Sequence, residues 1–340
     1  MDEFPAVSSE DIKKAMLELA DEPTTLMFHA EMHPPEDEDH EKKHHEEPGP
    51  LEAYSTFLAT RPSSFETCAI EEILSLAHLA PNLPLHIVHL SAMEAIPMLR
   101  KARAQGIPIT AETCFHYLSL AAEEIRDGDT RHKCCPPIRS QLNQDALWAE
   151  LEHHADNEGV IKTVVSDHSP CTPDLKLLPS HIPPGDSDTN HNGSFFSAWG
   201  GISSVGLGLP ILWTELSRRK NLTSSASVPG TGDDNGATKR ALQDIVRLCS
   251  YNTAVQVGLQ SQKGDLVPGC DADICIFDDA AEWTVEPSTM LFRNKCSPYQ
   301  GRVLRGLVRE TWLRGEKVFS REEGFSNKRP SGNLLLEERV

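Results

Sequence analysis

Residues of metal-binding type lie near the ends of three apolar runs in this sequence. His29 lies in the run at 24–31, His89 in the run at 83–91, and Asp167 ends the run at 160–167. Neutral imidazoles and a carboxylate suit a divalent ion such as Zn²⁺, with an open coordination position for water. The ion lowers the pKa of that water to about 7, and a nearby carboxylate can carry its proton to a leaving nitrogen. This chemistry would hydrolyse an amide.

Each of these residues also has an ordinary structural interpretation. A single histidine in an apolar strand is more often a hydrogen-bonded core residue, which is what we expect of His86. A lone aspartate before His-Ser-Pro is commonly a turn residue or a helix cap. The placement of His29, His89 and Asp167 at successive strand ends favours a shared functional site over three separate structural roles.

The elements that must position these side chains alternate between strand and helix. Continuous apolar runs at 24–31, 83–91, 107–113 and 160–167 predict parallel strands covered on both faces. Residues 65–80 and 92–105 have helical spacing, and Gly106 is typical of a helix end. Strand–helix alternation predicts an α/β fold, either a barrel or a doubly wound sheet. In a parallel α/β barrel, the carboxyl ends of the strands form the active-site face.

The rest of the chain divides into inserts and a C-terminal module. Loop inserts are expected at 32–50, 178–193 and 223–239, and the histidines of the first insert are expected to lie in a solvated acidic loop. Alternating strands with glycine turns near the C-terminus predict a partial β module. We therefore expect a barrel domain at 1–258, a β module at 259–320 and a tail at 321–340.

Composition excludes several classes of partner. The formal net charge of −19 over 340 residues disfavours nucleic acid and anionic membrane surfaces, so a small-molecule substrate is expected. Nine cysteines without a C-x-x-C pair indicate reduced thiols. The start "MDEFPAVSSEDIKK" lacks the apolar segment of a signal peptide, and we expect a cytoplasmic protein.

Several motifs carry a resemblance to a known family. The segments "LMFHAE", "HIVHLS", "AETCFHYL", "GDTRHKCCPPIR", "VVSDHSPCTPDLK", "AWGGISSVGLGLP" and "KGDLVPGCDADICIFD" resemble the cyclic amidohydrolases, most closely their allantoinase group, from about residue 2 to 318. The resemblance implies two zinc-type ions at the mouth of a (β/α)₈ barrel and hydrolysis of allantoin to allantoate in purine catabolism. It implies that His29 and His89 bind the more exposed ion, and that Asp167 binds the other and shuttles the proton. It also places four residues near the substrate: Cys135, Pro136, Gly200 and Gly201.

The chain also departs from that family pattern. It contains no H-x-H pair, and no strand-end lysine that could be carboxylated to bridge two ions. We therefore expect the C-terminal portion of such an enzyme: about half of a (β/α)₈ barrel with a partial β-sandwich, at most one weakly bound Zn²⁺, and little turnover. The full-length enzyme is expected to be a homo-oligomer. Two alternatives stay open, a hydantoinase or dihydropyrimidinase type of hydrolase and a non-catalytic interaction protein.

Overall fold

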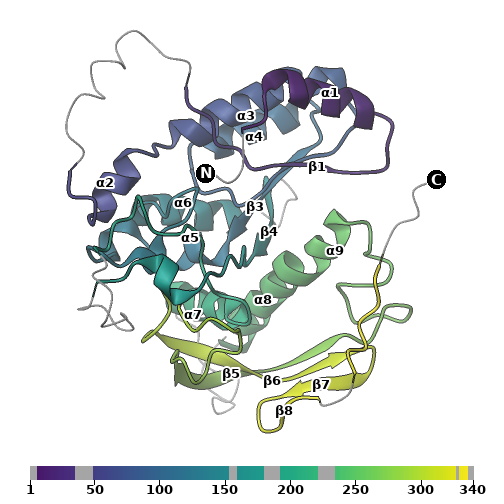
Figure 1. Ribbon diagram of the computed structural model, residues 1–340. Helices are drawn as coiled ribbons and strands as arrows, with labels where there is room; N and C mark the ends of the chain where they lie inside the picture. Colours follow the sequence, from purple (N-terminus) through teal and green to yellow (C-terminus); the bar gives the residue numbers. More distant parts are fainter. Residues whose placement is uncertain are drawn as a thin grey trace. The chain divides into compact units, whose positions relative to one another are not determined.

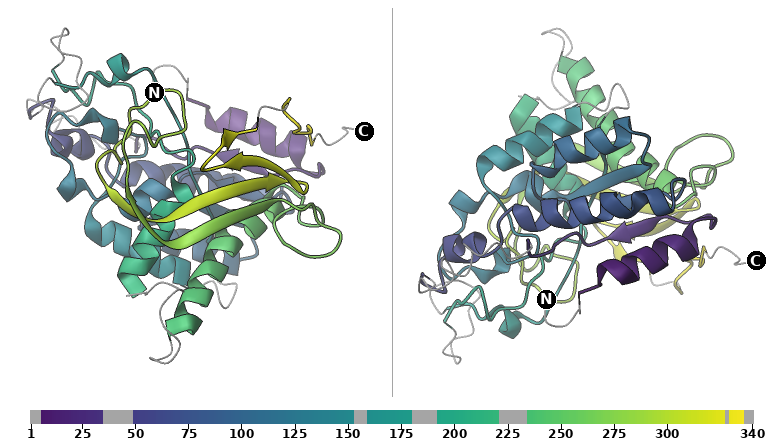
Figure 2. Two further views of the ribbon diagram at one scale, coloured as in Figure 1. Left: turned by 90° about the horizontal axis from the view of Figure 1, so that it is seen from below. Right: turned by 90° about the horizontal axis from the view of Figure 1, so that it is seen from above.

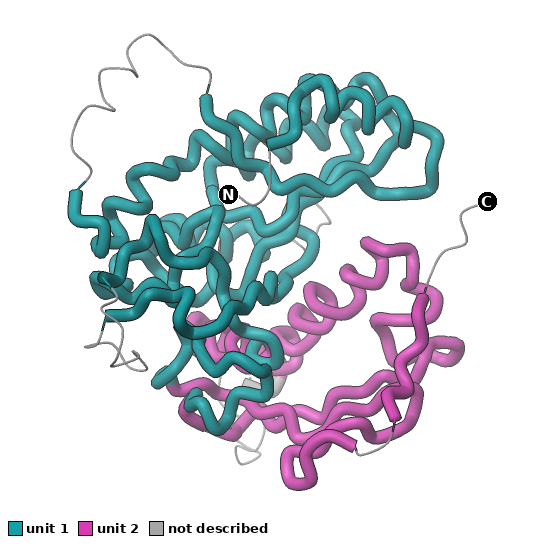
Figure 3. The backbone as a smooth tube through the Cα atoms, viewed as in Figure 1, with its two compact units in different colours: residues 1–208, 285–302 teal, residues 209–284, 303–340 magenta. Residues whose placement is uncertain are grey.

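The computed structural model describes residues 6–34, 49–152, 159–179, 192–220, 234–326 and 329–335. The chain forms two compact units, residues 1–208 with 285–302 and residues 209–284 with 303–340 (Figure 3). The domain division at 258 and 259 stays a prediction. Most of the three predicted inserts, including His40, His44 and His45, lies outside the described residues.

The first unit contains a four-stranded parallel sheet. Its strands are β1 (Leu26–Phe28), β2 (Leu85–Ile87), β3 (Ile109–Cys114) and β4 (Ile161–Val165), in the order β1-β2-β3-β4 (Figure 1). Every residue of β2 is buried, which explains why the strand has a continuous apolar pattern with only His86 as an exception. The predicted α/β class and the four parallel strands are confirmed.

Helices connect these strands. The α-helices of this unit are α1 (Ser9–Leu19), α2 (Tyr54–Ala59), α3 (Ser64–Leu76), α4 (Ala95–Ala104), α5 (Phe115–Ser119) and α6 (Gln141–Glu152). Short 3₁₀ turns lie at η1 (Ala77–Leu79), η2 (Ala122–Glu124), η3 (Thr130–His132) and η5 (Pro173–Lys176). The right view of Figure 2 shows α1 beside α3 and α3 beside α4.

The predicted helices at 65–80 and 92–105 correspond to α3 with η1 and to α4. Helix α4 buries Ile96, Leu99 and Ala102, the three-to-four-residue spacing of one helix face. Gly106 follows with a φ of 90°, a left-handed conformation that glycine adopts without a Cβ penalty, and it ends the helix as predicted.

The second unit contains an antiparallel sheet. Its strands are β5 (Ile274–Thr284), β6 (Val303–Leu313), β7 (Glu316–Ser320) and β8 (Gly324–Phe325), which lie side by side in the left view of Figure 2. Trp213, fully buried, packs edge-on against Phe277, and its indole N–H donates to the Asp279 carbonyl at 3.0 Å. The described residues of the predicted β module form one antiparallel sheet, and the second layer of a sandwich stays a prediction.

Helices α7 (Gly208–Lys220), α8 (Asp234–Val246) and α9 (Asn252–Gln256) complete the described structure, with a π-helical turn, η6 (Arg247–Tyr251), between α8 and α9. Helix α8 begins at Asp234, so the last residues of the predicted loop insert 223–239 are helical, which corrects that boundary. The segment looked like a loop because it is rich in Gly, Asp and Asn. No described helix is long and apolar enough to cross a membrane.

Candidate active site

The carboxyl ends of the four parallel strands carry the predicted site residues. His29 directly follows β1, while His89 and Asp167 each lie two residues beyond the last residue of their strands. Both His89 and Asp167 have a φ of 41°, in the left-handed region that non-glycine residues seldom adopt. Such backbone conformations cost about 1–3 kcal/mol and occur preferentially at functional sites.

His29 and His89 meet at adjacent strand ends. Nε2 of His89 lies 3.0 Å from Nδ1 of His29, and the two rings are edge to face with centroids 4.5 Å apart. Two imidazole nitrogens bound to one tetrahedral zinc ion lie about 3.3 Å apart, so this pair fits a shared divalent ion. Nδ1 of His89 is buried without a hydrogen-bond partner in the described part of the chain.

Glu31 fixes the orientation of His29. Its Oε2 atom lies 2.7 Å from Nε2 of His29, on the side of the ring opposite His89. A carboxylate that accepts the second ring N–H of a ligating histidine selects the tautomer whose other nitrogen can bind a metal. Burial and the neighbouring His29 lower the pKa of His89 to about 4, so its imidazole is neutral at pH 7, as a metal ligand requires.

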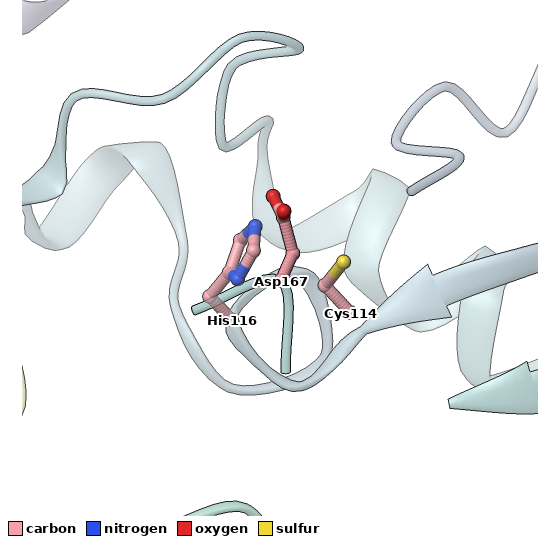
Figure 4. Close-up of side chains that lie close together, drawn as sticks. All are labelled: Cys114, His116 and Asp167. Atoms are coloured by element: carbon pink, nitrogen blue, oxygen red, sulfur yellow. The ribbon is translucent and has the colours of Figure 1, made fainter. Parts of the chain in front are cut away.

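Asp167 lies in a different set of contacts. Its carboxylate, the Cys114 thiol and the His116 ring have donor atoms that all lie within 4.8 Å of one another (Figure 4). Asp167 is exposed at its surface, but partial desolvation of its carboxyl raises the pKa of that group. The nearby Glu112 raises this pKa further, and His29 lowers it. Cys114 and His116 both lie in the "AETCFHYL" segment, and no role was predicted for either of them from the sequence.

Glu66 holds the strand end that carries His89. This buried α3 residue accepts hydrogen bonds through Oε2 from the backbone N–H groups of Ser91 and Ala92, at 2.8 and 3.1 Å. Its Oε1 atom accepts two more from the Arg139 guanidinium, at 2.8 and 3.3 Å. Sequence reasoning missed this carboxylate, because an acidic residue in the first turn of a helix is ordinarily a solvated one.

Two lysines hold the predicted substrate segment around Gly200 and Gly201, Lys176 through its side chain and Lys133 through its backbone carbonyl. The Lys176 ammonium, fully buried, donates to the carbonyls of Trp199 and Gly201 at 3.0 and 2.7 Å. The backbone N–H of Gly201 donates to the Lys133 carbonyl at 2.7 Å. Gly201 has a φ of 136°, and a Cβ there would collide with Ser169, so only glycine fits this approach.

The same segment is tied to the strand end that carries Asp167. Nδ1 of His168 accepts hydrogen bonds from the backbone N–H groups of Ser204 and Val205, both at 3.0 Å. The N–H of Ser169 donates to the Ile202 carbonyl, also at 3.0 Å. These bonds place the glycine segment beside Asp167, and its role in binding a substrate stays a prediction.

Two other predicted positions are now placed. The Pro136 carbonyl accepts a hydrogen bond from the Tyr117 hydroxyl at 2.7 Å, and its neighbour Cys135 is half-buried. His86 is fully buried in β2, with Nδ1 2.7 Å from the Thr110 hydroxyl. The interpretation of His86 as a hydrogen-bonded core residue is therefore confirmed.

Comparison with known proteins shows which family this sequence resembles. The amidohydrolase family model matches residues 2–316. The chain is 45% identical over 342 residues to an allantoinase of Saccharomyces cerevisiae, covering 100% of this chain and 64% of that protein. It is 38% identical over 338 residues to an allantoinase of Streptomyces avermitilis, covering 99% of this chain and 64% of that protein.

Solved structures share the fold. An L-hydantoinase from Arthrobacter aurescens superposes with a TM-score of 0.70 at 23% identity, covering 95% of this chain and 63% of that one. A D-hydantoinase from Thermus sp. gives a TM-score of 0.71 at 22% identity, covering 95% and 62%. The chain thus spans less than two thirds of the length of these relatives.

Proposed function

The chain belongs to the amidohydrolase family, and on that premise we propose that it carries part of a metal-dependent site that hydrolyses a cyclic amide, with allantoin as the substrate. The observation that supports the reaction class best is the contact between His29 and His89 at adjacent strand ends, with Asp167 on the same edge of the sheet. The choice of allantoin rests on the relatives that are named allantoinases.

His29 and His89 would hold a divalent ion of the zinc type. When bound, such an ion supplies a Lewis acid and lowers the pKa of water. Glu31 keeps the His29 ring oriented by accepting its Nε2–H. Two imidazoles are one ligand short of the usual three in a catalytic zinc site, so this pair holds at most one ion, and weakly.

Asp167 would move the proton. Its carboxylate accepts a proton from the attacking water and returns it to the ring nitrogen that leaves. The raised pKa of this carboxyl suits both steps, because a carboxyl that titrates closer to neutral pH is a better base and a usable acid. The segment at Gly200 and Gly201, with Cys135 and Pro136, would contact the substrate.

We infer further that the four-stranded parallel sheet is part of a (β/α)₈ barrel, which closes with eight strands. Residues 1–340 alone are then expected to turn over little or no allantoin. Supplying the segment of Saccharomyces cerevisiae allantoinase that this chain does not cover, fused or in trans, should restore allantoate formation.

The test measures allantoate formation by the complemented protein. Asp167→Asn should abolish the activity, while Asp174→Asn, which changes an exposed carboxylate on η5, should retain it. Robust hydrolysis by residues 1–340 alone would refute the inactivity claim. Hydrolysis of a hydantoin or a dihydropyrimidine but not of allantoin would overturn the substrate and favour the hydantoinase alternative. A complemented protein that binds the ion and hydrolyses none of these would favour the interaction protein.

The weak ion is tested separately by metal analysis after equilibration with Zn²⁺. His89→Ala should remove the ion held by the histidine pair, and His78→Ala, an exposed histidine after α3, should not. An unchanged affinity in His89→Ala would contradict the assignment of that ligand.

A further inference from the structure

Cys114, His116 and Asp167 converge because of strand register. Strand β3 ends at Cys114, which pairs with Val165 of the parallel strand β4. Asp167 lies two residues further along the β4 side, and His116 lies in the first turn of α5, directly after β3. Figure 4 shows the three side chains from these elements gathered at one point. Their sulfur, nitrogen and oxygen donor atoms all lie within 4.8 Å of one another.

His116 lacks the partners that a buried imidazole requires. Its side chain is 1% exposed, and neither Nδ1 nor Nε2 has a hydrogen-bond partner among the described residues. A neutral imidazole offers one donor and one acceptor, and each costs about 1–3 kcal/mol when buried unsatisfied. One of its lone pairs is therefore available to a cation.

We propose that Cys114, His116 and Asp167 bind one thiophilic divalent cation of the Zn²⁺ or Cd²⁺ type, at a site separate from the His29–His89 pair. One thiolate, one imidazole and one carboxylate are all common zinc ligands, and three protein ligands leave a fourth position open. Donor atoms around a tetrahedral zinc lie about 3.3–3.7 Å apart, so modest side-chain rotation closes the observed spacing. On binding, the Cys114 thiol loses its proton to the solvent as its sulfur bonds to the ion.

This site goes beyond the proposed function and does not depend on the substrate. The earlier expectation of at most one bound ion considered only the site at His29 and His89. With the second site, the chain could bind two thiophilic ions. Asp167 would be a ligand here, so an ion bound at this point would change the carboxylate that the proposed function uses for proton transfer. Hard cations such as Mg²⁺ are expected to bind poorly, because a thiolate and an imidazole are soft donors.

The test is a Co²⁺ titration of the 340-residue chain, followed by absorption. A thiolate ligand produces a sulfur-to-cobalt charge-transfer band in the near ultraviolet, which imidazole and carboxylate ligands do not. The band should appear in the wild type and persist in His29→Ala, which disrupts the histidine pair. Cys114→Ser and His116→Gln should abolish or strongly weaken it. Cys249→Ser, a thiol in the π-helical turn of the other unit, serves as the matched control and should leave it unchanged.

Two results would overturn the proposal: no charge-transfer band at saturating Co²⁺, or a band that survives Cys114→Ser. The first would mean that no thiolate of this chain binds the ion, and the second that a thiolate other than Cys114 does. X-ray absorption of the wild-type Zn²⁺ complex decides the matter should Cys114→Ser fail to fold. One sulfur in the zinc coordination shell supports the site, and a shell of nitrogen and oxygen only refutes it.

Discussion

Replacing Glu66 by alanine should destabilise the fold far more than the loss of an ordinary helix carboxylate. The Arg139 guanidinium is 9% exposed and would lose its anionic partner, and breaking a buried ion pair in this way costs about 3–5 kcal/mol. The N–H groups of Ser91 and Ala92 would lose their acceptor, at about 1–3 kcal/mol each where water does not replace it. With the broken ion pair and one N–H group left without an acceptor, we expect the free energy of unfolding to fall by about 4–8 kcal/mol.

The assay is urea unfolding of the variant set, with Glu71→Ala as the control because Glu71 is an exposed carboxylate on the same helix. The control should change the free energy of unfolding by less than about 0.5 kcal/mol. Glu66→Gln, which keeps one carbonyl acceptor, should be milder than Glu66→Ala. The pair Glu66→Ala with Arg139→Met should be less destabilised than Glu66→Ala alone, because no buried charge is left unpaired. A loss below about 1 kcal/mol in Glu66→Ala, or strict additivity with Arg139→Met, would refute this account.

Three further predictions address stability and association. Burial alone would raise the pKa of Asp129, yet the hydrogen bonds from Arg131 and His132 hold that pKa well below its ordinary range. These interactions of the ionised Asp129 therefore stabilise the fold above about pH 4, and the stabilisation is lost as the pH falls below that value. Asp129→Asn should therefore flatten the acid side of a stability–pH curve, and an unchanged slope would contradict it. Gly306→Ala should destabilise more than Gly315→Ala in thermal melts, because both residues have positive φ but only a Cβ at 306 would overlap neighbouring aromatic rings. The described parallel sheet has two edge strands, so size-exclusion chromatography of residues 1–340 should show self-association, and a monodisperse monomer would count against it.

The parallel strands could be predicted because their burial on both faces produces continuous apolar runs that few other elements share. The meeting of His29 and His89 followed from one rule, that parallel strands bring their carboxyl ends to one edge. The role of Glu66 could not be predicted, because its partners Ser91 and Ala92 lie 25 and 26 residues away and are backbone groups.

The cluster at Cys114 was missed for a related reason. Each of its members has an ordinary role when considered alone, and only the register between β3 and β4 brings them within reach of Asp167. The start of α8 was misplaced because Gly, Asp and Asn favour turns in an isolated segment, whereas the folded chain forms a helix from Asp234. Local composition therefore located the strands well and the helix boundary poorly.

The left-handed backbone at His89 and Asp167 affects which substitutions would stabilise the fold at these positions. Glycine would adopt a φ of 41° without the Cβ penalty, which is about 1–2 kcal/mol for other residues. His89→Gly would also remove a buried ring nitrogen that has no partner in the described structure. Selection for thermal stability alone would therefore favour loss of the side chain at this position, and a library sorted only for folding should enrich glycine there. A library sorted for metal retention should keep histidine at position 89. At this strand end, folding stability therefore favours glycine while metal binding favours histidine.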